Sequence, residues 1–228
     1  MFTCFSVQIW CFLLALVSLI YAMLYIYMEN LVRLLCERGV LKTKRVISAF
    51  QTIDRKEFVL HEDKENPYGD YPLSIGDEQT ISQPTTVAFM LELLGVAKKD
   101  KILDVGSGSG WTTALLAHLT GTKGKVVGVE IIPKLVKLGS GNLAKYDFPH
   151  AEIFEAGETL GLPAEAPFDK ILVSAVDESV PQELIDQLKV GGTMVIPIQN
   201  AVCKIHKVSR TENKIEKYEG FRFVPLMH

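Results

Sequence analysis

Hydrophobic and polar positions follow a repeating order in the second half of the chain. Short apolar runs end in polar or small residues, and amphipathic segments of about ten residues separate them. The runs are KILDV (101–105), KVVGVE (125–130), AEIFEA (151–156), DKILVSA (169–175) and GTMVIPI (192–198), and the segments with helical spacing are 111–120, 133–146 and 181–189. Strands separated by helices predict a doubly wound α/β fold, with a mainly parallel sheet and helices on both faces.

The flanking regions follow other patterns. Leu31, Leu34 and Leu35 have helical spacing, and a second short helix is expected over 42–51. Residues 61–82 are polar and rich in Pro and Gly, which predicts a long loop. Ser82 or Gln83 then caps a helix that has Pro84 at its first position. Residues 201–210 and 214–226 have no helix between them and predict an antiparallel pair at one edge of the sheet.

Residues 1–28 form a third kind of pattern, because they contain no charged side chain. This exceeds the roughly 20 apolar residues that a helix needs to cross a membrane. A cleaved signal peptide would begin with a basic residue and end in a small-x-small site, and a buried core helix is the other alternative. We predict a single membrane-spanning anchor over 1–28, with Tyr21, Tyr25 and Tyr27 at the interface. Basic residues follow the anchor and none precedes it, which predicts a cytoplasmic catalytic domain; they are Arg33, Arg38, Lys42, Lys44 and Arg45.

Charge and cysteine content exclude some classes of function. The chain has 24 Lys and Arg against 27 Asp and Glu, so it lacks the basic excess of a nucleic-acid-binding protein. The four cysteines show no paired spacing and the five histidines are scattered. We therefore expect no metal site, no disulfide framework and no nucleic-acid partner.

The stretch ILDVGSGSGW (102–111) carries the first candidate chemistry. Gly106, Gly108 and Gly110 follow a buried strand, which predicts a strand-to-helix turn that a ligand approaches closely; a turn without a ligand is the alternative. The spacing G-x-G-x-G differs from the G-x-G-x-x-G of dinucleotide sites. Asp104 would repel a pyrophosphate and attract an ammonium or sulfonium group, and Glu130 ends the next strand, where it can bind ribose hydroxyls. Unless Glu130 is an ordinary strand-end acid facing water, the pattern fits S-adenosylmethionine better than NAD.

Seven stretches together resemble the protein-L-isoaspartate O-methyltransferase family over about residues 30–226. They are VISAFQTIDRKEFV, PLSIGDEQTISQPTTVAFMLELL, ILDVGSGSGWTTALLAHL, VVGVE, GLPAEAPFDKILVSA, LIDQLKVGGTMVIPI and FRFVPL. The resemblance implies a Rossmann-like methyltransferase sheet and IGDEQTISQP as the loop that covers the cofactor and admits the substrate. It also implies methyl transfer from S-adenosylmethionine to the free carboxylate of L-isoaspartyl residues in damaged proteins. A membrane span is outside the family pattern.

The implied reaction needs no general base, because a carboxylate is already an anion at neutral pH. Ser82 matches the family's active-site serine, and its hydroxyl can position the carboxylate; a helix N-cap is the simpler role. Together, the motifs predict a cofactor site made of Ile81, Ser82, Thr85, Asp104, Gly106, Ser107, Gly108, Glu130, Ile131, Gly157 and Glu158.

The chain departs from the family pattern at three places. Thr85 stands where the family often has His or Tyr, which predicts a smaller pocket wall. Ala156-Gly157 stands where Gly-Asp is usual, so Glu158 is expected to replace the aspartate near the adenine amino group. The sequence stops at Met227-His228, where some relatives continue with polar residues that touch the cofactor.

The predicted organisation is an anchor (1–28), N-terminal helices with the covering loop (29–83) and a monomeric methyltransferase core (84–228). The expected partners are isoaspartyl peptides and proteins, and the membrane through the N-terminal helix. The alternatives are a methyltransferase of the same fold that acts on another carboxylate or a small or membrane-associated substrate, a non-enzymatic binding module, and a nicotinamide oxidoreductase.

Overall fold

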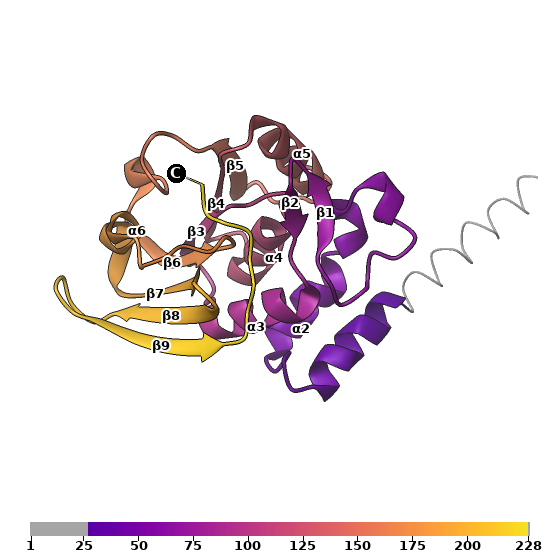
Figure 1. The fold of residues 1–228 in the computed structure, drawn as a ribbon, viewed down its shortest axis with the longest axis horizontal. Helices are drawn as coiled ribbons and strands as arrows, with labels where there is room; N and C mark the ends of the chain where they lie inside the picture. The colour runs from indigo at the N-terminus through magenta and orange to yellow at the C-terminus, as the bar shows by residue number, and fades with distance from the viewer. Residues whose placement is uncertain (1–26, 228) are drawn as a thin grey trace, which may run out of the picture.

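The fold is a seven-stranded sheet in the computed structural model, which describes residues 27–227 (Figure 1). The strand order is β5-β4-β3-β6-β7-β8-β9. Strands β3 to β7 pair in parallel, and β8 and β9 extend the sheet antiparallel beyond β7. The predicted fold class is confirmed, including its antiparallel edge. The bounds are β3 Lys101–Val105, β4 Lys125–Glu130, β5 Ala151–Glu155, β6 Phe168–Val173, β7 Leu188–Ile198, β8 Ala201–Lys207 and β9 Asn213–Glu219.

Helices cover both faces of the sheet because side chains alternate between faces along each strand. On β3, Ile102 belongs to the core beneath helices α2 to α5, whereas Leu103 and Val105 belong to the core beneath α6. The helices are α2 Lys44–Thr52, α3 Pro84–Leu94, α4 Trp111–Thr120, α5 Pro133–Leu143 and α6 Gln182–Gln187. The short 3₁₀ turns are η1 Arg55–Phe58, η2 His61–Asp63 and η3 Pro163–Glu165.

The loop predicted over 61–82 is wrong in its second half, which folds into a β-hairpin. Strands β1 (Leu73–Gly76) and β2 (Gln79–Ile81) pair antiparallel in a sheet of their own. Their two-residue turn places Asp77 and Glu78 at φ +48° and +61°, a conformation that usually selects Gly or Asn. The turn residues therefore gave no hairpin signal.

The predicted anchor over 1–28 lies, apart from its last two residues, outside the described residues. Those two residues belong to a helix that the structure describes over 27–37, in which Met28, Leu31 and Val32 are buried. Within 27–227, no helix combines the length and the apolar character that a membrane crossing requires.

The strand order positions a ligand site at the carboxyl end of β3. Beyond β3, the chain adds β4 and β5 on one side and β6 and β7 on the other, which leaves a crevice where the order reverses. The segment after β9 runs back toward these strand ends (Figure 1). It is held there by Val176 N–H donating to Val224 O (2.9 Å) and Leu226 N–H donating to Val176 O (2.8 Å).

Candidate active site

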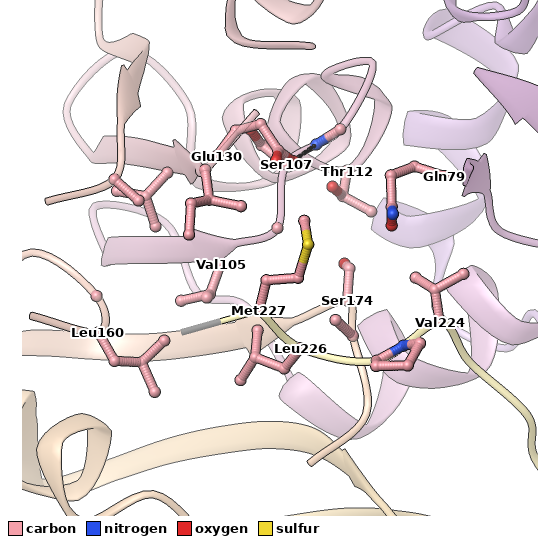
Figure 2. A pocket seen from close by; sticks show the side chains of 18 of the residues that line it. Gln79, Val105, Ser107, Thr112, Glu130, Leu160, Ser174, Val224, Leu226 and Met227 are labelled. Atoms are coloured by element: carbon pink, nitrogen blue, oxygen red, sulfur yellow. Dashed lines mark hydrogen bonds between the residues drawn. The ribbon is translucent and has the colours of Figure 1, made fainter. Parts of the chain in front are cut away.

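A cavity of about 370 Å³ lies at this crevice (Figure 2). The ends of β3, β4 and β6 form its floor, and the β1–β2 hairpin, residues 156–161 and residues 224–227 close around it. Met227 extends into the cavity in Figure 2. The lining includes nine of the predicted site residues: Ile81, Ser82, Gly106, Ser107, Gly108, Glu130, Ile131, Gly157 and Glu158.

The glycine turn has a conformation that side chains rarely permit. Gly106, Gly108 and Gly110 have φ of +75°, +51° and +88°. A Cβ on Gly110 would lie 2.9 Å from the carbonyl oxygen of Gly139, so this glycine also allows α5 to approach the turn. The third glycine of G-x-G-x-G therefore serves helix packing and does not itself line the cavity.

Glu130 accepts hydrogen bonds through both carboxylate oxygens, one of them from the glycine turn. Oε2 accepts from Gly108 N–H (2.9 Å) and Oε1 accepts from Ile132 N–H (3.0 Å), with the residue only 6% exposed. A carboxylate has about four acceptor positions, so two remain for a ligand. Glu130 thus lines the cavity as predicted, and the alternative of an acid facing water does not hold.

Asp104 occupies a different place from the one predicted. It is fully buried and is not among the lining residues. Its Oδ2 accepts from the hydroxyls of Thr112 and Thr113 (2.7 Å each), and its Oδ1 has no partner. Burial raises the pKa of Asp104 to about 6, against the opposing effect of the two hydroxyl bonds. The position alternates away from Val105, so the carboxyl group points at α4 and ties that helix to the sheet.

Ser82 lines the cavity and its hydroxyl makes no hydrogen bond to any described residue. The N-cap of α3 is Gln83, without a side-chain cap bond, so the capping role considered for Ser82 is wrong. The carbonyl oxygen of Ser82 accepts a hydrogen bond from Arg55 Nη2 at 3.3 Å. The hydroxyl is therefore available to a ligand.

Thr85 is the second predicted site residue that the cavity does not include. Its N–H and its hydroxyl both donate to Asp70, at 2.9 and 2.7 Å. This pairing directs Thr85 to the loop before β1. The expected reduction of the pocket wall at this position therefore finds no support in the structure.

The charge of the cavity is one-sided. Its charged lining residues are Glu130, Glu158 and Glu183, and the lining has no Lys, Arg or His among residues 27–227. Within the same residues, no group of three His, Cys, Asp or Glu side chains could hold a metal ion. Such a cavity favours a ligand that carries positive charge.

Known proteins resemble this chain in sequence. The profile of the protein-L-isoaspartate (D-aspartate) O-methyltransferase family matches residues 27–228. The chain belongs to this family. A protein-L-isoaspartate O-methyltransferase of Methanopyrus kandleri is 39% identical over 204 residues, 87% of this chain and 90% of the relative.

Two solved structures have the same fold. One, described as a protein-L-isoaspartate O-methyltransferase, has a TM-score of 0.79 at 25% identity. The match covers 88% of this chain and 66% of the chain of that structure. The other, a candidate protein-L-isoaspartate O-methyltransferase of Plasmodium falciparum in complex with S-adenosyl-L-homocysteine, has a TM-score of 0.75 at 26% identity, covering 87% and 97%. These likenesses extend over nearly the whole described domain.

S-adenosylmethionine, the cofactor of this family, fits the residues present. The open acceptor positions of Glu130 suit vicinal ribose hydroxyls, and the acidic lining suits a molecule with sulfonium and ammonium groups. Several lining residues are additional to the predicted site residues. The hairpin contributes Ile75, Gln79 and Thr80, β6 is followed by Ser174 and Ala175, and the chain end contributes Val224 to Met227. All of these except Met227 lie in stretches that carry the family resemblance, and the alternation of Leu73 and Ile75 could have indicated the hairpin.

Proposed function

We propose that this protein transfers a methyl group from S-adenosylmethionine to the free carboxylate of L-isoaspartyl residues in damaged proteins. The main support is that the Glu130 carboxylate and the Ser82 hydroxyl, which has no hydrogen-bond partner among residues 27–227, line one cavity. Glu130 belongs to the sheet and Ser82 belongs to the segment joining the hairpin to α3. The cavity therefore has a side suited to the cofactor and a side open to an acceptor.

On the cofactor side, Glu130 would hold the ribose hydroxyls, with the Gly106–Gly108 backbone and Ile131 beside them. Glu158 would accept from the adenine amino group next to Gly157. S-adenosylmethionine, when bound, supplies an electrophilic methyl group on a sulfonium. Asp104 and Thr85 would act on this site only indirectly, through α4 and through Asp70.

On the acceptor side, Ser82 would donate its hydroxyl to the attacking carboxylate and fix the direction of the oxygen, with Ile81 as an apolar wall. The carboxylate is ionised without help, so no proton has to be removed. Catalysis then depends on orientation and on excluding water, which the hairpin and residues 224–227 provide by covering the cavity.

A methyl-transfer assay on paired peptides tests this function. The full chain, purified in detergent, is given labelled S-adenosylmethionine and either an isoaspartyl peptide or its aspartyl twin. We expect transfer to the isoaspartyl peptide alone, as a base-labile ester. Equal transfer to both peptides, or to neither, would favour a different carboxylate or a membrane-associated substrate.

We also propose that residues 1–28 anchor the protein in a membrane by a single span, with the catalytic domain in the cytoplasm. The uncharged sequence and the basic residues that follow it support this placement, and Arg33, Lys42 and Lys44 are exposed. Residues 29–83 would contribute the binding site for the acceptor, and residues 84–228 would contribute the binding site for the cofactor. Since Met28 packs on the domain, the test fragment should begin at residue 27.

The full chain should sediment with membranes and resist carbonate extraction, whereas fragment 27–228 should remain in the supernatant and keep most of its activity on peptides. Recovery of the full chain in the soluble fraction would refute the proposed membrane anchor.

A further inference from the structure

Arg55 is a buried cation with an unusual set of partners. It is 2% exposed, and its guanidinium donates to the carbonyl oxygens of Pro67 (2.6 Å), Gly69 (3.2 Å), Tyr71 (3.0 Å) and Ser82 (3.3 Å). No carboxylate in the described chain forms an ion pair with it, and its Nε has no partner. Burial lowers the pKa of Arg55 to about 10, so the group stays protonated at neutral pH.

The contacts of Arg55 connect both sides of the cavity. The guanidinium lies 5.5 Å from the centre of the Trp111 ring, and Trp111 is the residue that follows the glycine turn and lines the cavity. On its other side, Arg55 holds the loop before the hairpin and the backbone of Ser82. One side chain therefore fixes Ser82 relative to the start of α4.

Charge gives this placement a second consequence. In the described part of the chain, residues 27–227, the cavity lining contains three carboxylates and no cation, but the proposed acceptor is itself an anion. Arg55 reaches the main chain of Ser82, so its positive charge lies behind the residue that would receive the carboxylate. In a buried setting, such a charge is weakly screened.

We infer that Arg55 is a positioning residue for methyl transfer. It fixes the position of Ser82 relative to the glycine turn. It also supplies the positive charge that attracts an anionic acceptor to the serine side of the cavity. This role rests on the proposed function, because it presumes a carboxylate acceptor at Ser82. Arg55 itself does not line the cavity and acts through Ser82.

A double-mutant cycle tests this inference, using Arg55→Gln, Ser82→Ala and the double variant in the full chain. Arg55→Gln should lower kcat for the isoaspartyl peptide by roughly tenfold or more and raise the KM for the peptide, with S-adenosyl-L-homocysteine affinity nearly unchanged. The double variant should be little slower than the slower single variant, because the two residues act as one unit. Arg55→Lys, which keeps the charge, should recover part of the lost rate.

Lys207→Gln is the matched control. Lys207 is also buried, 7% exposed, and donates to two carbonyl oxygens, those of Ile185 and Leu188, but none of these residues lines the cavity. It should lower the melting temperature without changing the kcat of the folded fraction.

Two outcomes would overturn the role of Arg55. In the first, the kcat losses of Arg55→Gln and Ser82→Ala multiply in the double variant. In the second, the rate of Arg55→Lys falls only in proportion to the loss of folded protein, as expected for the control. If wild type and Lys207→Gln both failed to methylate the isoaspartyl peptide, the proposed function would fail first, and this inference with it.

Discussion

The two sides of the cavity are held by different kinds of interaction. The cofactor wall, residues 104–110 with Glu130, is fixed by parallel strands and by a carboxylate bonded to backbone N–H groups. The acceptor wall, residues 73–82, contains a hairpin that forms a two-stranded sheet of its own. Among the described residues, it is held by the packing of Leu73, Ile75 and Ile81 in the core and by the bond from Arg55 to Ser82 O. An exposed ion pair, Asp77 with Lys134 at 3.1 Å, joins its tip to α5.

This difference separates two tasks. A wall built on the main sheet can keep a cofactor site formed before any ligand arrives, whereas a hairpin outside that sheet can be displaced without breaking the ladder of the main sheet. Changes in the cofactor wall should therefore affect cofactor affinity, and changes in the acceptor wall should affect turnover.

Ser82→Ala should produce the largest effect. Loss of one orienting hydrogen bond suggests a fall in kcat of roughly 10- to 1000-fold, with cofactor affinity nearly unchanged. Ser174→Ala, which removes another hydroxyl from the cavity lining, is the control. Paired pH–rate profiles on one isoaspartyl peptide would measure this, and activity should stay flat from about pH 6 to 8 because neither reacting group titrates there. If Ser82→Ala lost cofactor affinity as strongly as it lost kcat, the assignment of cofactor affinity to one wall and turnover to the other would be wrong.

Glu130→Ala should weaken the cofactor wall. Charge-assisted hydrogen bonds contribute about 1.5–3 kcal/mol each, so S-adenosyl-L-homocysteine affinity measured by calorimetry should fall by at least tenfold, and the KM for S-adenosylmethionine should rise. The control is Glu155→Ala, since Glu155 lies opposite Glu130 on β5 and does not line the cavity. Unchanged binding in Glu130→Ala would refute the ribose assignment.

Asp104→Asn should stabilise the cofactor wall in a pH-dependent way. Since burial raises the pKa of Asp104 from 3.8 to about 6, the folded protein holds a proton in this window that the unfolded chain has released. The contribution of Asp104 to the free energy of unfolding is therefore highest below pH 4 and declines as pH rises toward 6, by at most about 3 kcal/mol.

The isosteric amide can still accept from Thr112 and Thr113 and has no charge to bury. Its stability relative to wild type should rise between pH 4 and 7 in denaturant titrations. A difference that is constant over this range would mean that Asp104 stays ionised.

Asp77→Asn should have the smallest effect, because Lys134 is 81% exposed in the ion pair. Exposed pairs contribute less than about 1 kcal/mol, and asparagine tolerates the positive φ of this position. We expect kcat/KM for the peptide within about threefold of wild type, in low and high salt. A large change confined to low salt would show that this ion pair closes the hairpin.

The sequence alone determined the sheet and most of the cofactor wall. Strands β3 and β4 and helix α4 have the predicted bounds, because an apolar run followed by glycines and an amphipathic segment leaves few alternatives. Glu130 was found for the same reason: a residue that ends a parallel strand must lie at the carboxyl edge of the sheet.

Only the tertiary structure decided how the remaining side chains are used. Asp104 and Glu130 lie on the same face of the sheet, because Asp104 pairs with Gly128 in the parallel register. Asp104 lies one residue inside the end of β3, beneath α4, whereas Glu130 lies one residue beyond the Val105–Val129 pair and lines the cavity. Thr85 was drawn away by Asp70, and the carbonyl oxygens that hold Arg55 come from four separate positions of the chain. Such contacts join residues far apart in sequence, so no local pattern encodes them.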